Sequence, residues 1–192
     1  METLRLYLLD VASLPLEKAD LLSASEQTKM HRYVKVEDRR LFLGSRLLCK
    51  KVLGSSEFSH LDNGKPFLEA GPSFSLSHSY PYVALLVGEA SPVGVDLEAK
   101  ERVLLSKLEE YLPPSDRDRV PDLASLWCLK EAIYKARGKD YFNPKAPFEE
   151  ISKDQVRFAG GSFFYRVLEK EGFVIVAVSS TPFEAEMITV DL

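Results

Sequence analysis

The sequence has few of the residues on which several classes of protein depend. It contains two cysteines, Cys49 and Cys128, among 192 residues, too few for a disulfide-stabilised scaffold or a zinc site built from cysteines. No apolar run approaches the roughly 20 residues that a membrane-spanning helix requires. The first residues lack the basic segment and the small-residue cleavage site of a secretory signal peptide. We therefore expect a cytoplasmic protein that does not bind membranes.

An excess of positive charge is also missing. The chain has 25 Lys and Arg against 29 Asp and Glu, which gives a formal net charge of -4. This balance removes the general attraction to phosphate backbones that nucleic-acid-binding proteins use, so no nucleic-acid partner is expected. A local basic excess does occur in one segment, at Arg32, Lys35, Arg39, Arg40, Arg46, Lys50 and Lys51.

Glycine-rich phosphate loops are absent as well. The chain has no Walker loop and no dinucleotide fingerprint, so any bound phosphate would have to be held by side chains. It also lacks the Gly-X-Ser-X-Gly turn that presents a nucleophilic serine in many hydrolases. Hydrophobic residues make up 45% and charged residues 28% of the chain, which is typical of a folded globular domain.

The order of the predicted elements indicates an α+β fold. Helices are expected over residues 23–53, 103–112 and 123–137. Strands are expected over residues 1–9, 67–69, 74–77, 82–87, 93–98, 156–158, 163–168, 173–178 and 185–190. Gly54 and Gly138 are expected to end helices, and Asp122 to cap the start of one. The succession of strand, helices, strands, helices and strands predicts two similar halves that meet near residues 88–93.

Two carboxylates are spaced two residues apart in the strand expected at residues 93–98. Alternate side chains of a strand face the same side, so Asp96 and Glu98 share one face while Val95 and Leu97 face the core. Such a pair is either solvated at a strand end or bridged by a hard divalent cation. Gly94, directly before the pair, allows another backbone or a ligand to approach closely.

A second candidate site lies in the helix expected over residues 123–137. Trp127, Glu131 and Lys135 are spaced by four residues and therefore share one helical face. An exposed Glu–Lys pair at this spacing is typical of a solvated helix and contributes only about 0.3 to 0.5 kcal/mol. The large aromatic side chain of Trp127 favours a partly buried face, where a carboxylate and an ammonium need a partner such as a metal or a phosphate.

Two further segments carry polar groups suited to an anion. His78 stands between Ser77 and Ser79 near a strand end and can donate hydrogen bonds to an anionic ligand, or it is simply a polar surface residue. Lys65 lies in a predicted turn, Asn-Gly-Lys-Pro at residues 63–66, where it either contacts an anion or is solvated.

Taken in order, these segments resemble one enzyme family. Asn-Gly-Lys-Pro at 63–66, Phe-Ser-Leu-Ser-His-Ser at 74–79, Val-Gly-Val-Asp-Leu-Glu at 93–98 and the helix from Trp127 to Lys139 resemble the 4'-phosphopantetheinyl transferases of the surfactin-synthetase-activating type. The resemblance runs from about Lys29 to Lys139, and the last two segments are its most specific part.

The resemblance implies a fold and an activity. The expected fold is a pseudodimer of two similar α/β subdomains, residues 1–90 with the coenzyme A nucleotide contacts and residues 91–192 with the metal and the catalytic helix. The expected reaction transfers the phosphopantetheine arm of coenzyme A to a serine of an apo acyl or peptidyl carrier protein and releases 3',5'-ADP. Fatty-acid, polyketide and nonribosomal-peptide carriers all remain open, and the enzyme is expected to work as a monomer.

The resemblance also assigns residues. Asp96, Glu98 and Glu131 would coordinate Mg²⁺ with pyrophosphate oxygens of coenzyme A, and Lys135 would bind the pyrophosphate and neutralise the leaving group. Contacts to coenzyme A are further expected from Arg40 (3'-phosphate), Lys65 (nucleotide), Ser77 and His78 (phosphates), with Lys29 a looser match.

Glu131 is also the candidate base for the serine proton, directly or through a water molecule. An acidic carrier would favour a basic surface near the site, for which Arg39, Arg46, Lys50 and Lys51 are candidates. Two rival interpretations remain: a non-catalytic module of the same fold that binds coenzyme A or a carrier protein, and a Mg²⁺-dependent phosphohydrolase that uses the same carboxylates.

Overall fold

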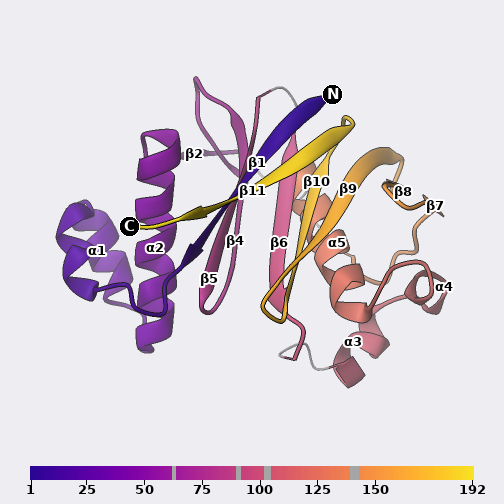
Figure 1. The fold of residues 1–192 in the computed structure, drawn as a ribbon, viewed down its shortest axis with the longest axis horizontal. Coiled ribbons are helices and arrows are strands. Elements are labelled where there is room, and N and C mark those ends of the chain that lie inside the picture. The colour runs from indigo at the N-terminus through magenta and orange to yellow at the C-terminus, as the bar shows by residue number, and fades with distance from the viewer. Residues whose placement is uncertain (62–63, 90–91, 102–104, 139–142) are drawn as a thin grey trace.

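The computed structural model describes residues 1–61, 64–89, 92–101, 105–138 and 143–192. Two β-sheets pack against each other, and a long helix covers the outer face of each (Figure 1). The helices are a 3₁₀ helix at Leu16–Leu21, α1 (Ala24–Met30), α2 (Val36–Leu53), α3 (Leu105–Tyr111), α4 (Pro114–Arg117) and α5 (Leu123–Arg137). This arrangement is the mixed α and β architecture expected from the sequence.

The two sheets differ in size. The first has the order β11 (Phe183–Val190), β1 (Glu2–Asp10), β5 (Tyr82–Gly88), β4 (Ser73–Ser79). The second has the order β6 (Val93–Ala99), β10 (Phe173–Ser179), β9 (Gly161–Lys170), β8 (Gln155–Phe158), β7 (Glu150–Ile151). A small hairpin pairs β2 (Ser59–His60) with β3 (Pro66–Phe67).

Alternation along the strands sorts apolar side chains into three cores. Leu4, Leu6 and Leu8 of β1 pack with Val95 and Leu97 of β6 in the core between the sheets, as the period of two requires. The opposite face of the first sheet packs on α2, and that of the second sheet packs on α5. The prediction that Val95 and Leu97 face the core is therefore confirmed.

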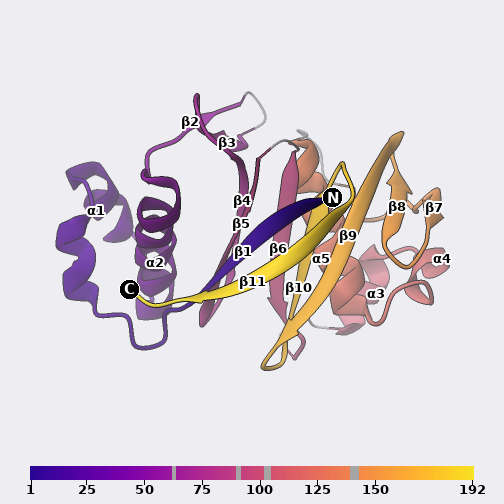
Figure 2. The same cartoon turned by 45° about the horizontal axis from the view of Figure 1, so that its top comes forward.

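The last strand returns to the first sheet. β11 pairs parallel with β1 in a register that joins Glu2 to Phe183, and Figure 2 shows the two strands running side by side. The expected boundary between the two subdomains, at residues 90 and 91, lies outside the described residues, between β5 and β6. β11 belongs to the expected second subdomain by its residue numbers, but it pairs in the first sheet. The expected pseudodimer of two subdomains stays a prediction.

Helix boundaries match the sequence in part. α5 begins after Asp122, whose side chain accepts a hydrogen bond from the Ser125 amide, and it ends at Gly138 in the left-handed conformation, as predicted. The helical character expected over residues 23–53 corresponds to α1 and α2, which residues 31–35 separate. The helix expected at 103–112 corresponds to α3, and residues 102–104 lie outside the described residues. No helix in the described parts of the chain is both long and apolar enough to span a membrane.

Candidate active site

Strands β4 and β6, the adjacent edges of the two sheets, are joined by serine side chains. The Val93 amide donates to Ser73 Oγ over 3.3 Å, and the Val95 amide donates to Ser75 Oγ over 3.1 Å. Because these serines are two residues apart, they all face β6. They bind amide groups of β6 through hydroxyls and so join the two sheets without a backbone ladder between these strands.

The same row of serines continues onto the two carboxylates. Ser77 Oγ donates to Asp96 Oδ1 over 2.8 Å, and Ser79 Oγ donates to Glu98 Oε2 over 3.2 Å. Asp96 is 5% exposed and Ser77 is 7% exposed. The prediction that Asp96 and Glu98 share a face is confirmed, and the solvated strand end does not describe Asp96, which is buried and bonded across the junction.

Helix α5 lies unusually close to β6 at Gly94. A Cβ atom added at Gly94 would lie 1.9 Å from the Ala132 carbonyl oxygen and 2.8 Å from the Ala136 amide nitrogen. Both distances are shorter than any real side-chain contact, so only glycine permits this approach. The contact brings the helical face with Glu131 and Lys135 to the carboxylates of β6.

Lys135 completes a partly buried triangle with the junction residues. Its Nζ lies 2.7 Å from Asp96 Oδ1 and 3.0 Å from Ser77 Oγ. The second oxygen of Asp96, Oδ2, is buried and meets no N–H or O–H donor among the described residues; the buried Cys128 thiol lies beside this carboxylate, and its pKa is raised by burial and by Asp96. An unsatisfied buried carboxylate oxygen is costly unless a cation or donor meets it, which makes Oδ2 the strongest indication of a ligand at this site.

Glu131 interacts electrostatically with the carboxylates of Asp96 and Glu98. Burial raises the pKa of the Glu131 carboxyl, Asp96 and Glu98 raise it further, and Lys135 opposes this shift. A carboxylate such as Glu131, whose charged form is disfavoured by burial and by neighbouring negative charges, is stabilised by a cation.

In the described ranges no group of three or more His, Cys, Asp or Glu side chains forms a ready-made metal site, and the Lys135 ammonium already contacts Asp96. The donors are nevertheless hard carboxylate oxygens of the kind that Mg²⁺ prefers. Asp96, Glu98 and Glu131 as a metal site therefore stays a prediction, which the donor chemistry and the Oδ2 atom of Asp96 support.

Two cavities flank this cluster on either side of Leu76, which lines both. One, of about 230 Å³, includes Lys65, Tyr134, Lys135 and Gly138 in its wall. The other, of about 180 Å³, is lined by Lys29, Tyr33, Asp38, Leu41, Phe42, Ser45, Arg46, Leu76 and His78. Each cavity therefore combines apolar surface with cationic side chains, as a site for a phosphorylated ligand requires.

His78 and Lys65 both border these cavities. The surrounding protein lowers the pKa of the His78 imidazole, and the positive charge of Lys135 contributes to this shift. Burial lowers the pKa of Lys65 to about 8. Its Nζ donates to the carbonyl oxygens of Val93 and Ala136, so it does not stand free in solvent.

Arg40 is not brought to this cluster. Its Nε donates to the Leu14 carbonyl over 3.2 Å, and it is absent from the residues that line the cavity of His78. Lys29, the looser match, does line that cavity, and its ammonium lies 5.9 Å from the centre of the Phe42 ring. Arg46 lines it too, although the sequence indicated Arg46 only as part of a basic surface.

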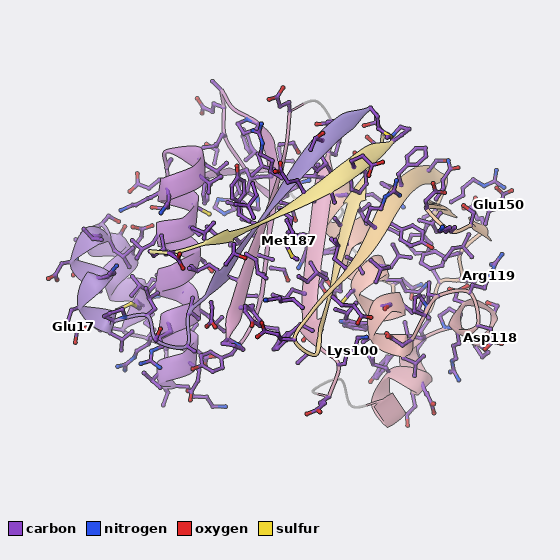
Figure 3. The ribbon with its side chains drawn as sticks, viewed as in Figure 1. Glu17, Lys100, Asp118, Arg119, Glu150 and Met187 are labelled. Carbon is purple, nitrogen blue, oxygen red and sulfur yellow. The ribbon has the colours of Figure 1, made fainter. Side chains whose placement is uncertain are left out.

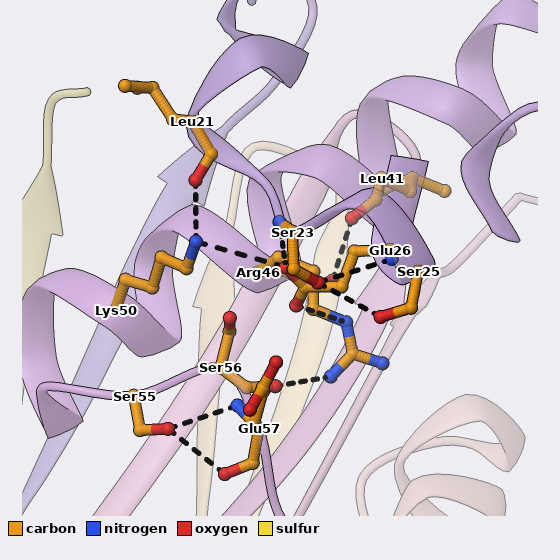
Figure 4. A network of polar contacts seen from close by, with 11 residues as sticks. Leu21, Ser23, Ser25, Glu26, Leu41, Arg46, Lys50, Ser55, Ser56 and Glu57 are labelled. Carbon is orange, nitrogen blue, oxygen red and sulfur yellow. Dashed lines mark hydrogen bonds and ion pairs between the residues drawn. The ribbon is translucent and has the colours of Figure 1, made fainter. Parts of the chain in front are cut away.

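The candidate basic surface on α2 is largely engaged by local contacts. Arg46, Lys50 and Glu26 form a polar network that connects α1 to α2 (Figure 4). Lys50 also donates to the Leu21 carbonyl, Lys51 to the Asp191 carbonyl and Arg39 to the Tyr33 carbonyl. These lysines and arginines thus hold the helix layer together.

A buried ion pair between α4 and α5 was not predicted from the sequence. Lys130 and Asp116 are both inaccessible to solvent, with 3.0 Å between Nζ and Oδ2. Lys130 also donates to the Ala146 carbonyl, and Asp116 accepts from the Phe148 amide. The signal for it was the position of Lys130, four residues after the core residue Leu126, on the buried face of the helix.

The N-terminal end of α5 is linked to β6 by Lys100, which directly follows that strand (Figure 3). Lys100 Nζ lies 3.5 Å from Oδ2 of Asp122, the residue that caps α5, and 2.5 Å from Oε1 of Glu169 on β9. These contacts are partly exposed and contribute little stability, but they place the start of α5 beside the end of β6.

Comparisons with known proteins agree with this geometry. The model of the 4'-phosphopantetheinyl transferase superfamily matches residues 92–170, which include β6 and α5. The chain is 27% identical over 171 residues to the 4'-phosphopantetheinyl transferase gsp of Aneurinibacillus migulanus, covering 80% of this chain and 70% of that protein.

Two cyanobacterial proteins are similar at the same level. A putative 4'-phosphopantetheinyl transferase of Synechocystis, slr0495, is 27% identical over 161 residues, covering 70% of this chain and 65% of that protein. The 4'-phosphopantetheinyl transferase HetI of Nostoc is 28% identical over 144 residues, covering 62% of this chain and 61% of that protein. The matched part thus spans between three-fifths and seven-tenths of each relative.

Proposed function

We propose that the chain, which is similar to 4'-phosphopantetheinyl transferases, transfers the 4'-phosphopantetheine group of coenzyme A to a serine of an apo acyl or peptidyl carrier protein and releases 3',5'-ADP. The observation that carries this proposal is the cluster of Ser77, Asp96 and Lys135 at the junction of the sheets, where a buried carboxylate oxygen meets no N–H or O–H donor among the described residues. Such a cluster suits a cation and a pyrophosphate held together.

Asp96, Glu98 and Glu131 are the residues that would hold Mg²⁺. Their carboxylates come from β6 and α5, and burial together with the negative charges of Asp96 and Glu98 raises the pKa of Glu131. When bound, Mg²⁺ would neutralise negative charge on the pyrophosphate oxygens of coenzyme A. The residues of the chain would bind the cofactor, orient it and accept the proton.

The transfer forms one phosphorus–oxygen bond and breaks another. The serine oxygen of the carrier bonds to the phosphorus that carries the pantetheine arm, and the bond from that phosphorus to 3',5'-ADP breaks with its electron pair on the departing phosphate. Lys135 is placed to neutralise this charge, because its ammonium lies at the junction beside Asp96. Glu131 would accept the serine proton, directly or through a water molecule.

The two cavities beside the cluster are the proposed sites for coenzyme A. His78 and Lys29 would contact its phosphates from the smaller cavity, and Ser77 would do so from the junction. Arg40, bonded to the Leu14 carbonyl, would have to change its rotamer to reach a 3'-phosphate. A pseudodimer of two subdomains, acting as a monomer, would place coenzyme A between its halves.

Transfer to a carrier tests this proposal. The purified protein is incubated with coenzyme A, Mg²⁺ and a panel of apo carrier proteins from fatty-acid, polyketide and nonribosomal-peptide synthesis, and the intact mass of each carrier is measured. We expect at least one carrier to gain a phosphopantetheine group on its serine, and its Ser→Ala variant to gain none. Binding of coenzyme A without transfer to any carrier would instead favour a non-catalytic module, and release of phosphopantetheine without an acceptor would favour a phosphohydrolase.

A further inference from the structure

Lys65 reaches from the loop before β3 to the two elements that carry the candidate active site. Its Nζ lies 3.2 Å from the Val93 carbonyl oxygen at the start of β6 and 3.1 Å from the Ala136 carbonyl oxygen at the end of α5. One side chain thus binds both elements from outside them. These two contacts join segments that are 28 and 71 residues away in the sequence.

The carbonyl of Ala136 is one that the helix itself leaves unsatisfied. The last four carbonyls of an α-helix lack an intrahelical partner, and α5 ends at Arg137. A cation at this end also interacts favourably with the helix dipole. Lys65 therefore supplies both a hydrogen bond and a charge that suit the end of α5.

The same place is where α5 approaches β6 most closely. Gly94, next to Val93, faces the Ala136 amide and the Ala132 carbonyl. Lys65 lies beside this contact and bridges its two partners, since it donates to Val93, the residue before Gly94, and to Ala136 in the last turn of the helix. The position of Lys135, adjacent to Ala136, depends on how this turn sits on the strand.

We propose that Lys65 is a positioning residue for the transfer reaction: it holds the last turn of α5 on the start of β6, and so sets the distance of Lys135 from Asp96. This inference rests on the proposed function. Its physical basis is that a catalytic group displaced by about 1 Å costs on the order of a hundredfold in rate. The lowered pKa of Lys65, about 8, is consistent with an ammonium enclosed by protein.

The role differs from the nucleotide contact that the family resemblance implies for Lys65. A nucleotide contact would act on binding of coenzyme A, whereas a positioning contact acts on the chemical step. The two roles therefore separate in the KM for coenzyme A and the kcat. They also separate in the protein without any ligand, where only a positioning contact restrains the end of α5.

The experiment compares Lys65→Met, which removes both hydrogen bonds, with Lys65→Arg, which keeps donors at the end of a long side chain. Arg117→Met is the matched control, because Arg117 also donates to a backbone carbonyl, that of Leu112, but on α4 and outside every candidate site. For Lys65→Met we expect kcat to fall by about ten- to a hundredfold, with the KM for coenzyme A changed by no more than about twofold. We expect Lys65→Arg to recover most of kcat, and Arg117→Met to resemble the wild type.

A second measurement needs no activity. Hydrogen exchange in the unliganded protein should speed up at Gly138, whose amide bonds to the Tyr134 carbonyl, in Lys65→Met but not in Arg117→Met. The amides of β5 should be unchanged. This readout remains decisive if the wild type modifies no carrier, which would defeat the proposed function alone.

The inference is overturned if Lys65→Met raises the KM for coenzyme A and leaves kcat unchanged, or if both constants stay at wild-type values. It is also overturned if exchange at the end of α5 does not change. Should Lys65→Met fail to fold, Lys65→Gln and Lys65→Arg are compared instead. A kcat for the Gln variant equal to or above that of the Arg variant then contradicts the role.

Discussion

The side chains of Asp96 and Lys135 form an ion pair between β6 and α5, with 2.7 Å between Lys135 Nζ and Asp96 Oδ1. Asp96 is nearly inaccessible at 7% side-chain exposure, while Lys135 retains 27%. The pair thus has an enclosed carboxylate and a cation with one side toward the cavity. Because Lys135 is partly exposed, its ammonium is able to bind an incoming anion. The buried second oxygen of Asp96 is suited to a cation.

Asp96→Asn removes the charge but keeps an oxygen that can accept hydrogen bonds from Ser77. We expect transfer activity to fall by at least about a hundredfold, because an amide is a poor ligand for a divalent cation compared with a carboxylate. Initial rates with apo carrier protein over a range of Mg²⁺ concentrations measure the loss. The matched control is Asp154→Asn, an exposed residue between β7 and β8 whose side chain accepts one long hydrogen bond, of 3.5 Å from Ser152 Oγ, and it should retain wild-type rates.

Lys135→Ala tests the cation of the same pair. We expect kcat to fall more than the affinity for Mg²⁺, because Lys135 is assigned to the charge that develops on the leaving phosphate rather than to the metal. Steady-state kinetics at varied Mg²⁺ separates the two quantities. A variant with normal kcat and strongly weakened Mg²⁺ dependence would contradict this assignment.

Local patterns predicted α5 well because its ends are marked by side chains and backbone chemistry. Asp122 provides the N-cap and Gly138 the left-handed residue that ends the helix. The break between α1 and α2 has no such mark, since residues 31–35 contain neither glycine nor proline, and Lys35 at the start of α2 makes no side-chain cap. The sequence therefore indicated helical character over residues 23–53 without locating this break.

Contacts between distant segments were harder to predict than the face of a strand on which each side chain lies. Alternation showed that Asp96 and Glu98 point the same way, but it gave no register to β4, so the bonds from Ser77 and Ser79 were not foreseen. The parallel pairing of β11 with β1 has no local signal either. What places the candidate site is thus the packing of β4, β6 and α5, which no single stretch of sequence encodes.

Gly94→Ala tests the close approach of α5 to β6. The added Cβ would meet the Ala132 carbonyl oxygen at 1.9 Å, and because this atom is helix backbone, the whole helix has to move. We expect a loss of unfolding free energy of about 1–3 kcal/mol or more, together with a large loss of activity. Urea unfolding followed by circular dichroism measures the first, and carrier modification the second.

Gly71→Ala is the control for that substitution. Its added Cβ would lie 3.1 Å from Leu68 Cδ1 and 3.2 Å from Leu68 Cβ, so a single neighbouring residue has to shift slightly and no helix backbone has to move. We expect a change in unfolding free energy within about 0.5 kcal/mol, as for most substitutions away from special sites. If Gly94→Ala were equally mild, the tight contact would not be what sets the place of α5.

The buried Lys130–Asp116 pair leads to a prediction about unfolding free energy. Asp116→Ala leaves Lys130 as an unpaired cation in the core, which we expect to cost about 3–5 kcal/mol of unfolding free energy. Lys130→Met in the same protein should recover much of this loss, because it removes the orphaned charge and keeps the apolar stem. Urea unfolding of both single variants and the double variant measures the coupling. Additive losses would contradict an ion pair that matters as a unit.

Lys65 also predicts how stability depends on pH. Burial lowers its pKa to about 8 from an ordinary value of 10.5, so between these values the unfolded chain binds more protons at this group than the folded chain. Unfolding free energy must then rise with pH through this window. Among the residues that the structure describes, the charged groups that line cavities with Lys65 are Lys135, Arg137 and Glu89, and all three are kept in Lys65→Met.

The measurement is the difference in unfolding free energy between the wild type and Lys65→Met, taken by urea unfolding from pH 7 to pH 10. Groups common to both proteins cancel in this difference, so what remains is the titration of Lys65. We expect the difference to shift in favour of the wild type as the pH rises above 8, because the folded protein gives up the buried proton before the unfolded chain does. A difference that stays flat, or that shifts toward the variant, would mean that the ammonium of Lys65 is not penalised by its surroundings, and the enclosed contact with Val93 and Ala136 would then be too open to hold α5.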